Sequence, residues 1–163
     1  MTTDDQGGEP QVRVAAQALA NAERLALDAS PHELGGIMVG WWEGDSTAVV
    51  QALLPVPDHA AGRSHYERRH SPAQEVLDVY MRTHNDPRCG YVGEWHSHPA
   101  PQPPSATDRG VLSAIVRQRR KTVALVVLTL TGEGEVTSHG LIGRPRWPRR
   151  ASIEVALVER MSL

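Results

Sequence analysis

The chain has 163 residues and a hydrophobic fraction of 40%, which suits one domain with a packed core. Its net charge of −2 argues against a nucleic-acid-binding surface and against a polybasic membrane-binding surface. Cys89 is the only cysteine, and the sequence contains no secretory h-region and no apolar run of membrane-spanning length. We therefore expect a cytoplasmic protein without disulfides.

The first 70 residues predict a tail, a strand, a helix, a hairpin and a loop, in that order. Residues 1–10 are polar and acidic and predict a disordered tail, whereas residues 11–163 predict one domain. Apolar residues recur at helical spacing before Ser30-Pro31, and two apolar runs then flank a short polar turn. The predicted elements are a strand at Val12–Val14, a helix at Ala15–Ala29, strands at Leu34–Trp42 and Thr47–Leu54, and a loop at Pro55–His70.

From Ser71 onward, helices and strands are mixed without regular alternation. Ser71, Pro72 and Gln74 match a capping box at the start of a helix. Thr122–Leu130 is β-branched and apolar and predicts a central strand, while Ile153–Leu157 predicts a final edge strand with a helix as the alternative. The other predicted elements are the helix body to Thr83, a strand at Gly90–Ser97, a loop at Pro101–Pro104, a helix with Val111, Leu112, Ile115 and Val116, and a strand at Val136–Ile142. This pattern predicts an α+β (mixed α/β) fold with a single central mixed β-sheet flanked by helices.

The segment from Glu94 to Arg109 contains a candidate metal site. His96 and His98 lie two apart on a predicted strand, so their side chains face the same way. Asp108 follows after nine residues, near the start of the next helix. Two imidazoles and one carboxylate form a ligand set of catalytic zinc, whose fourth position is left for water. The sequence therefore predicts one Zn²⁺ per chain at His96, His98 and Asp108, in a metal-dependent hydrolase.

Hydrolysis of an amide bond also needs a group that moves a proton to the leaving amine. Glu33 is our candidate, because it opens a buried strand where a carboxylate is costly without a role; a solvated loop carboxylate is the alternative. Ser105 can cap the helix that carries Asp108, or it can donate a hydrogen bond to the oxyanion of a tetrahedral intermediate. We expect its hydroxyl to do only one of these at a time, and Thr107 is a second candidate for the cap.

Three further features carry weaker predictions. Glu94 shares a strand face with the two histidines and is a candidate for orienting an imidazole. Cys89 has no Cys-His arrangement around it, which predicts a buried and inert thiol. The residues 144–150 contain four arginines, which form either a solvated tail or a patch that docks an acidic partner.

Taken in order, Glu33, His96-Ser97-His98-Pro99, Ser105 and Asp108 resemble the JAMM (MPN-plus) zinc metallopeptidase signature, within a match of roughly 12–142. The resemblance implies an MPN/cytidine-deaminase-like fold, with His96, His98 and Asp108 as zinc ligands, Glu33 as general acid/base and Ser105 as oxyanion stabiliser. The lead-in to the histidines looks most like the compact prokaryotic branch, which includes the deconjugating protease of CBASS antiphage systems. One departure is that the family pattern has ten residues between the second histidine and the aspartate.

The resemblance implies a zinc-dependent isopeptidase that hydrolyses the bond after the C-terminal glycine of a ubiquitin-like protein or its conjugate. The implied partner is the C-terminal tail of that protein, with no nucleic acid and no membrane. One alternative is a hydrolase that releases an amino acid such as cysteine from a sulfur-carrier protein. Another is a non-catalytic MPN binding module.

Overall fold

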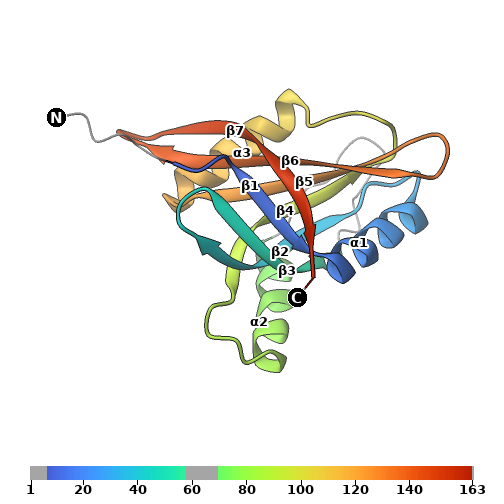
Figure 1. The fold of residues 1–163 in the computed structure, drawn as a ribbon, viewed down its shortest axis with the longest axis horizontal. Coiled ribbons are helices and arrows are strands. Elements are labelled where there is room, and N and C mark those ends of the chain that lie inside the picture. Colours follow the sequence, from blue (N-terminus) through green and yellow to red (C-terminus); the bar gives the residue numbers. More distant parts are fainter. Residues whose placement is uncertain (1–6, 58–69, 163) are drawn as a thin grey trace.

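The structure, a computed structural model, describes residues 7–57 and 70–162. These residues form seven strands and three helices. Figure 1 shows their arrangement. The strands are β1 (Gln11–Ala15), β2 (Gly35–Glu43), β3 (Thr47–Pro55), β4 (Gly90–His98), β5 (Val123–Leu130), β6 (Val136–Arg146) and β7 (Arg150–Met161). The helices are α1 (Ala16–Ala29), α2 (His70–Thr83) and α3 (Ala106–Arg119).

The strands form one mixed sheet in the order β1-β3-β2-β4-β5-β6-β7, and the sheet closes on itself as a barrel. Neighbours are antiparallel except where β4 pairs with β5 and where β1 pairs with both β3 and β7. The mixed sheet with helices is thus confirmed, but β7 was wrongly predicted to be an edge strand. Its residues Leu157 to Met161 pair with β1, a contact between the two ends of the chain that a local apolar pattern cannot reveal.

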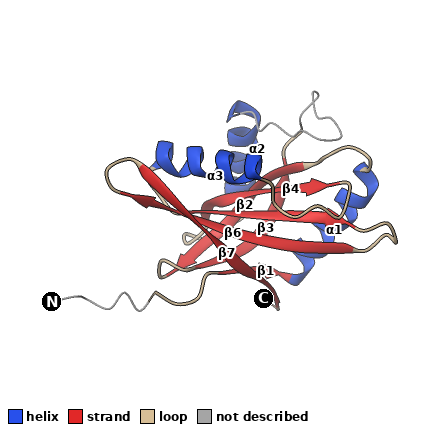
Figure 2. Cartoon of the chain, turned by 90° about the horizontal axis from the view of Figure 1, so that it is seen from above, coloured by secondary structure: helices blue, strands red, loops and turns tan. Residues whose placement is uncertain are grey.

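The two faces of the sheet are covered by different helices. Leu19 and Ala22 of α1 are buried in a cluster on the inner side, together with Trp95 and alternate residues of β5. Leu112 and Val116 of α3 cover the outer side of β5, and α2 covers the outer side of β2. Figure 2 shows α2 and α3 over the same face. Since both faces of β5 are covered, all eight of its residues are buried, as its apolar sequence predicted.

A register shift in β4 decides which of its side chains face outward. The pairing between β2 and β4 slips between Met38 and Val39, so Val92 and Trp95 both lie in the inner cluster although they are three residues apart. Gly93 lies at this point, and a Cβ there would meet the carbonyl oxygen of Ala124 at 1.9 Å. Beyond the shift, alternate residues starting with Glu94 face the outer side, where α3 begins.

The remaining element predictions hold within one or two residues, except for the last two strands, and β7 runs to Met161, four residues past the predicted Ile153–Leu157. β6 continues past Ile142 to Arg146, and β7 begins at Arg150, because the two strands remain paired up to the turn. The final segment is a strand, so the helix alternative is wrong. Residues 1–6 of the predicted tail and 58–69 of the predicted loop lie outside the described residues, as does the Ser71 side chain. No helix among the described residues has the length and apolar character needed to cross a membrane.

Candidate metal centre

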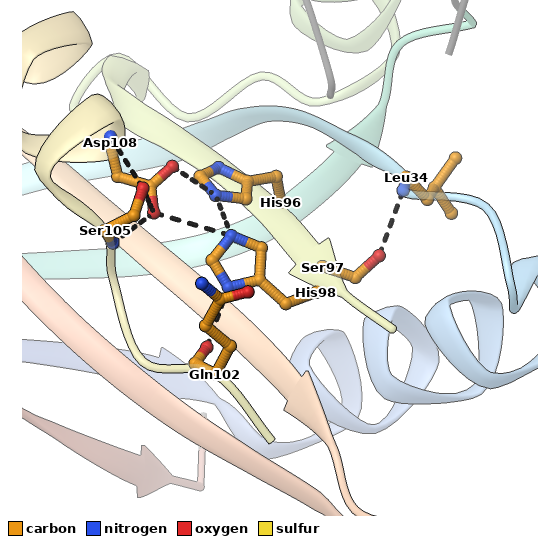
Figure 3. Close-up of polar contacts among 7 residues, drawn as sticks. All are labelled: Leu34, His96, Ser97, His98, Gln102, Ser105 and Asp108. Carbon is orange, nitrogen blue, oxygen red and sulfur yellow. Dashed lines mark hydrogen bonds and ion pairs between the residues drawn. The ribbon is translucent and has the colours of Figure 1, made fainter. Parts of the chain in front are cut away.

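The outer face of β4 and the first turn of α3 bring the three predicted ligands together. His96 and His98 are alternate residues at the end of β4, and Asp108 is the third residue of α3. Figure 3 shows the two imidazoles and the carboxylate pointing toward one another, while Ser97 points away from them. One ligand atom of each residue lies within 4.8 Å of the others. The shorter loop between His98 and Asp108 therefore does not prevent the cluster from forming.

The two imidazole nitrogens lie at the spacing expected for a tetrahedral zinc ion, and the Asp108 carboxylate lies against both of them. The Nε2 atoms of His96 and His98 lie 3.2 Å apart. The Asp108 carboxylate approaches the same two atoms, with Oδ1 at 3.0 Å from His96 Nε2 and Oδ2 at 3.4 Å from His98 Nε2. Two donors bound at about 2.0–2.1 Å to one tetrahedral ion lie about 3.3 Å apart. The donor set and its spacing therefore fit zinc.

Asp108 is held by the helix that it begins. The hydroxyl oxygen of Ser105 accepts the Asp108 backbone N–H at 3.2 Å, and Asp108 Oδ2 accepts the Ser105 backbone N–H at 2.6 Å, which completes a capping box. The Ser105 hydroxyl also donates to Oδ2 at 2.9 Å. Burial alone would raise the pKa of the Asp108 carboxyl, but the hydrogen bond and charge of His96, and then the Ser105 contacts, lower the pKa well below its usual value. Asp108 is therefore ionised at neutral pH, as a metal ligand must be.

The proline-rich loop fixes the orientation of His98. Nδ1 of His98 lies 2.7 Å from the backbone carbonyl oxygen of Gln102. A carbonyl oxygen can only accept, so Nδ1 carries the proton and Nε2 is the nitrogen left to bind a metal. This contact was not predicted from the sequence. The carbonyl belongs to the backbone, and its position depends on the turn in which the Gln102 N–H donates to Ala100 at 2.7 Å.

Glu33 lies beside the ligand strand. The Ser97 N–H donates to the Leu34 carbonyl at 2.7 Å, and the Leu34 N–H donates to the Ser97 hydroxyl at 3.0 Å. These two bonds extend the antiparallel register that pairs Gly35 with His96. The chain directly after Glu33 therefore lies beside the end of β4, and Glu33 itself is buried, with 7% of the residue exposed. Ser97, for which no role was predicted from the sequence, thus ties the segment after Glu33 to β4.

Two other predictions concern residues near the cluster. Glu94 is buried two residues before His96 and accepts a hydrogen bond from the Tyr91 hydroxyl at 2.8 Å. Its proposed role in orienting an imidazole remains a prediction. Cys89 is buried, and burial, followed by the charge of Asp86, raises the pKa of its thiol, in agreement with an inert cysteine.

Comparison with known proteins identifies the family of the chain. The family model for prokaryotic homologs of the JAB domain matches residues 15–140. The curated relatives include a CD-NTase/cGAS isopeptidase from Enterobacter hormaechei subsp. hoffmannii, 27% identical over 82% of this chain and 74% of the relative. They also include the probable metalloprotease y4qB from Sinorhizobium fredii, 29% identical over 75% of this chain and 79% of the relative. A CD-NTase/cGAS isopeptidase from Pseudomonas aeruginosa is 31% identical over 58% of this chain and 62% of the relative.

A solved structure supports the fold. The solution structure of protein DSY2949 from Desulfitobacterium hafniense superposes with a TM-score of 0.64, covering 93% of this chain and 95% of that one. The two sequences are 17% identical, so the similarity concerns the fold and not the function. The family model covers most of the chain and confirms the resemblance to the JAMM (MPN-plus) group. The chain therefore belongs to the family of prokaryotic homologs of the JAB domain.

Proposed function

We propose that the protein is a zinc-dependent peptidase that hydrolyses the bond after the C-terminal glycine of a ubiquitin-like protein or its conjugate. The observation that carries this proposal is the cluster of His96, His98 and Asp108, whose ligand atoms lie within 4.8 Å of one another and form a donor set that suits zinc. The isopeptidase and metalloprotease names of the relatives support the same class of reaction. One Zn²⁺ per chain and a cytosolic location remain our expectations.

In this proposal His96 Nε2, His98 Nε2 and the Asp108 carboxylate hold the ion. When bound, zinc supplies a Lewis acid that polarises the substrate carbonyl and lowers the pKa of the attacking water. Glu33 takes a proton from that water and passes it to the leaving amine, a role that suits a buried carboxylate beside the ligand strand. The Gln102 carbonyl keeps the His98 proton on Nδ1 throughout.

Ser105 can combine the two roles that the sequence analysis treated as exclusive. A hydroxyl has one donor and two acceptor positions, and helix capping uses an acceptor position for the Asp108 N–H. Its donor, which contacts Asp108 Oδ2 in the structure, can turn to an oxyanion without loss of the cap. We therefore propose that Ser105 both caps α3 and stabilises the tetrahedral intermediate.

The biological setting is proposed from the relatives. Two of them carry the name CD-NTase/cGAS isopeptidase, so we propose that the substrate is a protein conjugate and that the reaction removes a ubiquitin-like tag from a nucleotidyltransferase of an antiphage CBASS system. Release of an amino acid from a sulfur-carrier protein would use the same residues. Parallel assays of the two substrate types separate these settings.

The direct test is cleavage of a fluorogenic substrate, a Gly-Gly-ending tail with an aminocoumarin leaving group, by wild-type protein and by the Glu33→Ala variant. The expected result is loss of cleavage in the variant with zinc content unchanged, because Glu33 moves protons and does not bind the ion. Glu75→Ala, which changes an exposed carboxylate on α2, is the control and should cleave at the wild-type rate. Cleavage by Glu33→Ala at the wild-type rate would refute the assigned chemistry, and a zinc-free wild-type protein would favour a non-catalytic module.

A further inference from the structure

Six exposed basic residues gather at one end of the molecule, where α3 ends and the β6–β7 hairpin turns. We call this group the basic end. It consists of Arg117, Arg120, Lys121, Arg146, Arg149 and Arg150. The two segments meet because α3 packs on β6 and β7, and because the start of β5 pairs with the end of β6, with Val123 opposite Gly143. Figure 1 shows the end of α3 and the β6–β7 turn at the same end of the fold.

These charges are not neutralised within the described part of the chain. Among the described residues, no carboxylate forms an ion pair with the basic end, and Arg146 donates instead to the Ser152 hydroxyl across the hairpin at 3.1 Å. Arg144, just behind the group, is the arginine that pairs with Glu154, at 3.7 Å. Basic residues in the last turn of a helix complement its dipole, which accounts for Arg117 but not for the hairpin. The hairpin charges therefore remain available to a partner.

An exposed aromatic side chain lies among these charges. Trp147 at the hairpin turn is 92% exposed, the highest value among the large hydrophobic residues of the described part of the chain. Tryptophan and arginine are the residues most enriched at the energetic centres of protein interfaces. Arg120 also adopts a left-handed conformation with φ of 53°, at a helix end where glycine is normally favoured. The exposed tryptophan lowers the solubility of the free protein, and the left-handed arginine lowers its stability. Both features suit a docking surface.

The basic end lies within reach of a protein that is bound at the metal centre. Helix α3 begins at the cluster and ends at the basic end, so Arg117 and Arg120 lie nine and twelve residues after Asp108, or about 13–18 Å along the helix axis. A folded domain of about 75 residues is about 25–30 Å across. A protein joined to the scissile bond by a short tail can therefore touch the basic end while its tail occupies the centre.

We propose that the basic end docks an acidic face of the folded tag whose glycine-ending tail enters the metal centre. This inference rests on the proposed function. The tag is chosen over the acceptor protein because it is the constant part of every conjugate, and a fixed surface can complement only a constant partner. The occupant is acidic because six positive charges around an exposed tryptophan attract carboxylates and repel a basic surface.

The test compares three substrates with the same tail and the same aminocoumarin leaving group. One is the tail peptide alone, one carries a ubiquitin-like domain with an acidic surface, and one carries the same domain with those carboxylates neutralised. The enzyme variants are Arg117→Glu/Trp147→Ala/Arg149→Glu, called the docking variant, and Arg120→Gly. The matched control reverses two exposed arginines elsewhere, Arg24→Glu/Arg82→Glu.

We expect the docking variant to raise KM for the acidic-domain substrate about 10–100-fold with kcat unchanged, and to cleave the tail peptide like wild type. Arg120→Gly should raise the melting temperature and yet weaken the same KM. The control should match wild type on all three substrates. In wild type, the acidic domain should lose its advantage over the neutralised one at about 0.5 M NaCl, where exposed charges are screened.

Equal KM values for wild type and the docking variant on the acidic-domain substrate, with tail cleavage intact, would overturn the docking proposal and leave the function standing. If wild type cleaves none of the substrates, the proposed function is refuted. Docking is then measured as the affinity for the acidic domain in a calorimetric titration. Equal affinities for wild type and the docking variant would then overturn it as well. Tighter binding of a 20-nucleotide single-stranded DNA than of the acidic domain would also overturn it.

Discussion

The Ser105 hydroxyl joins helix stability to the proposed chemistry, and two substitutions separate these roles. In the Ser105→Ala variant, the acceptor for the Asp108 N–H is lost together with the donor to Asp108 Oδ2. Loss of an N-cap side chain costs about 1 kcal/mol, and loss of a hydrogen bond to a charged group adds about 1 kcal/mol or more. We therefore expect the free energy of unfolding of the metal-free variant to fall by about 1–3 kcal/mol, measured by urea denaturation with tryptophan fluorescence.

The Ser105→Gly variant is the matched comparison, because glycine at the N-cap costs only a few tenths of a kcal/mol relative to serine. Both variants lack the proposed oxyanion donor, so both should lose about 10²–10³ in kcat although their stabilities differ. Near wild-type kcat in Ser105→Gly would show that Ser105 acts through the cap alone. Wild-type stability in Ser105→Ala would show that the cap contributes nothing.

Three other predictions follow from the structure. Zinc at about 100 times its Kd should stabilise the protein by about 2.7 kcal/mol and raise the melting temperature by about 5–11 °C. The His98→Ala variant should show no such rise in melting temperature. A rise that persists in this variant would place the ion elsewhere. Gly36→Ala should lower the free energy of unfolding by about 3 kcal/mol or more, because the new Cβ would lie 1.8 Å from the Leu54 carbonyl oxygen. Gly110→Ala on α3, where nothing lies within 4 Å of the new Cβ, should instead raise that free energy by about 0.5–1 kcal/mol. Equal changes in the two variants would contradict this packing. The raised pKa of Cys89 predicts alkylation by iodoacetamide at pH 8 at least about tenfold slower than in urea-unfolded protein, and equal rates would count against its burial.

The element pattern of the sequence predicted most of the fold, because local apolar spacing determines both where each strand lies and which face it buries. β5 is an example, since an unbroken β-branched run is expected only where both faces are covered. β7 shows the limit of this reasoning. Its alternating residues Val155 and Leu157 are 71% and 51% exposed, and its partner β1 lies at the other end of the chain. Barrel closure depends on that long-range pairing, which no local pattern encodes.

The candidate site also has a part that local spacing predicted and a part that depends on tertiary structure. Spacing alone predicted that His96 and His98 share a face, and the structure brings Asp108 to them. The supporting contacts were not predictable, because they involve backbone groups placed by tertiary structure. The Gln102 carbonyl reaches His98 only through the fold of the proline-rich loop, and the bonds between Ser97 and the Leu34 segment span more than 60 residues. Sequence reasoning predicted the three candidate ligands that the structure brings together, and it missed the backbone groups that hold them.

We propose that the imidazoles of His96 and His98 at the end of β4 and the carboxylate of Asp108 in the first turn of α3 hold a zinc ion. Anomalous diffraction at the zinc absorption edge, from crystals of the zinc-loaded protein, tests it most directly. We expect one peak per chain, about 2.0–2.2 Å from His96 Nε2, His98 Nε2 and one Asp108 carboxylate oxygen. A fully occupied peak elsewhere in the chain, or no peak at this position in zinc-saturated crystals, would show that these three residues are not the ligands.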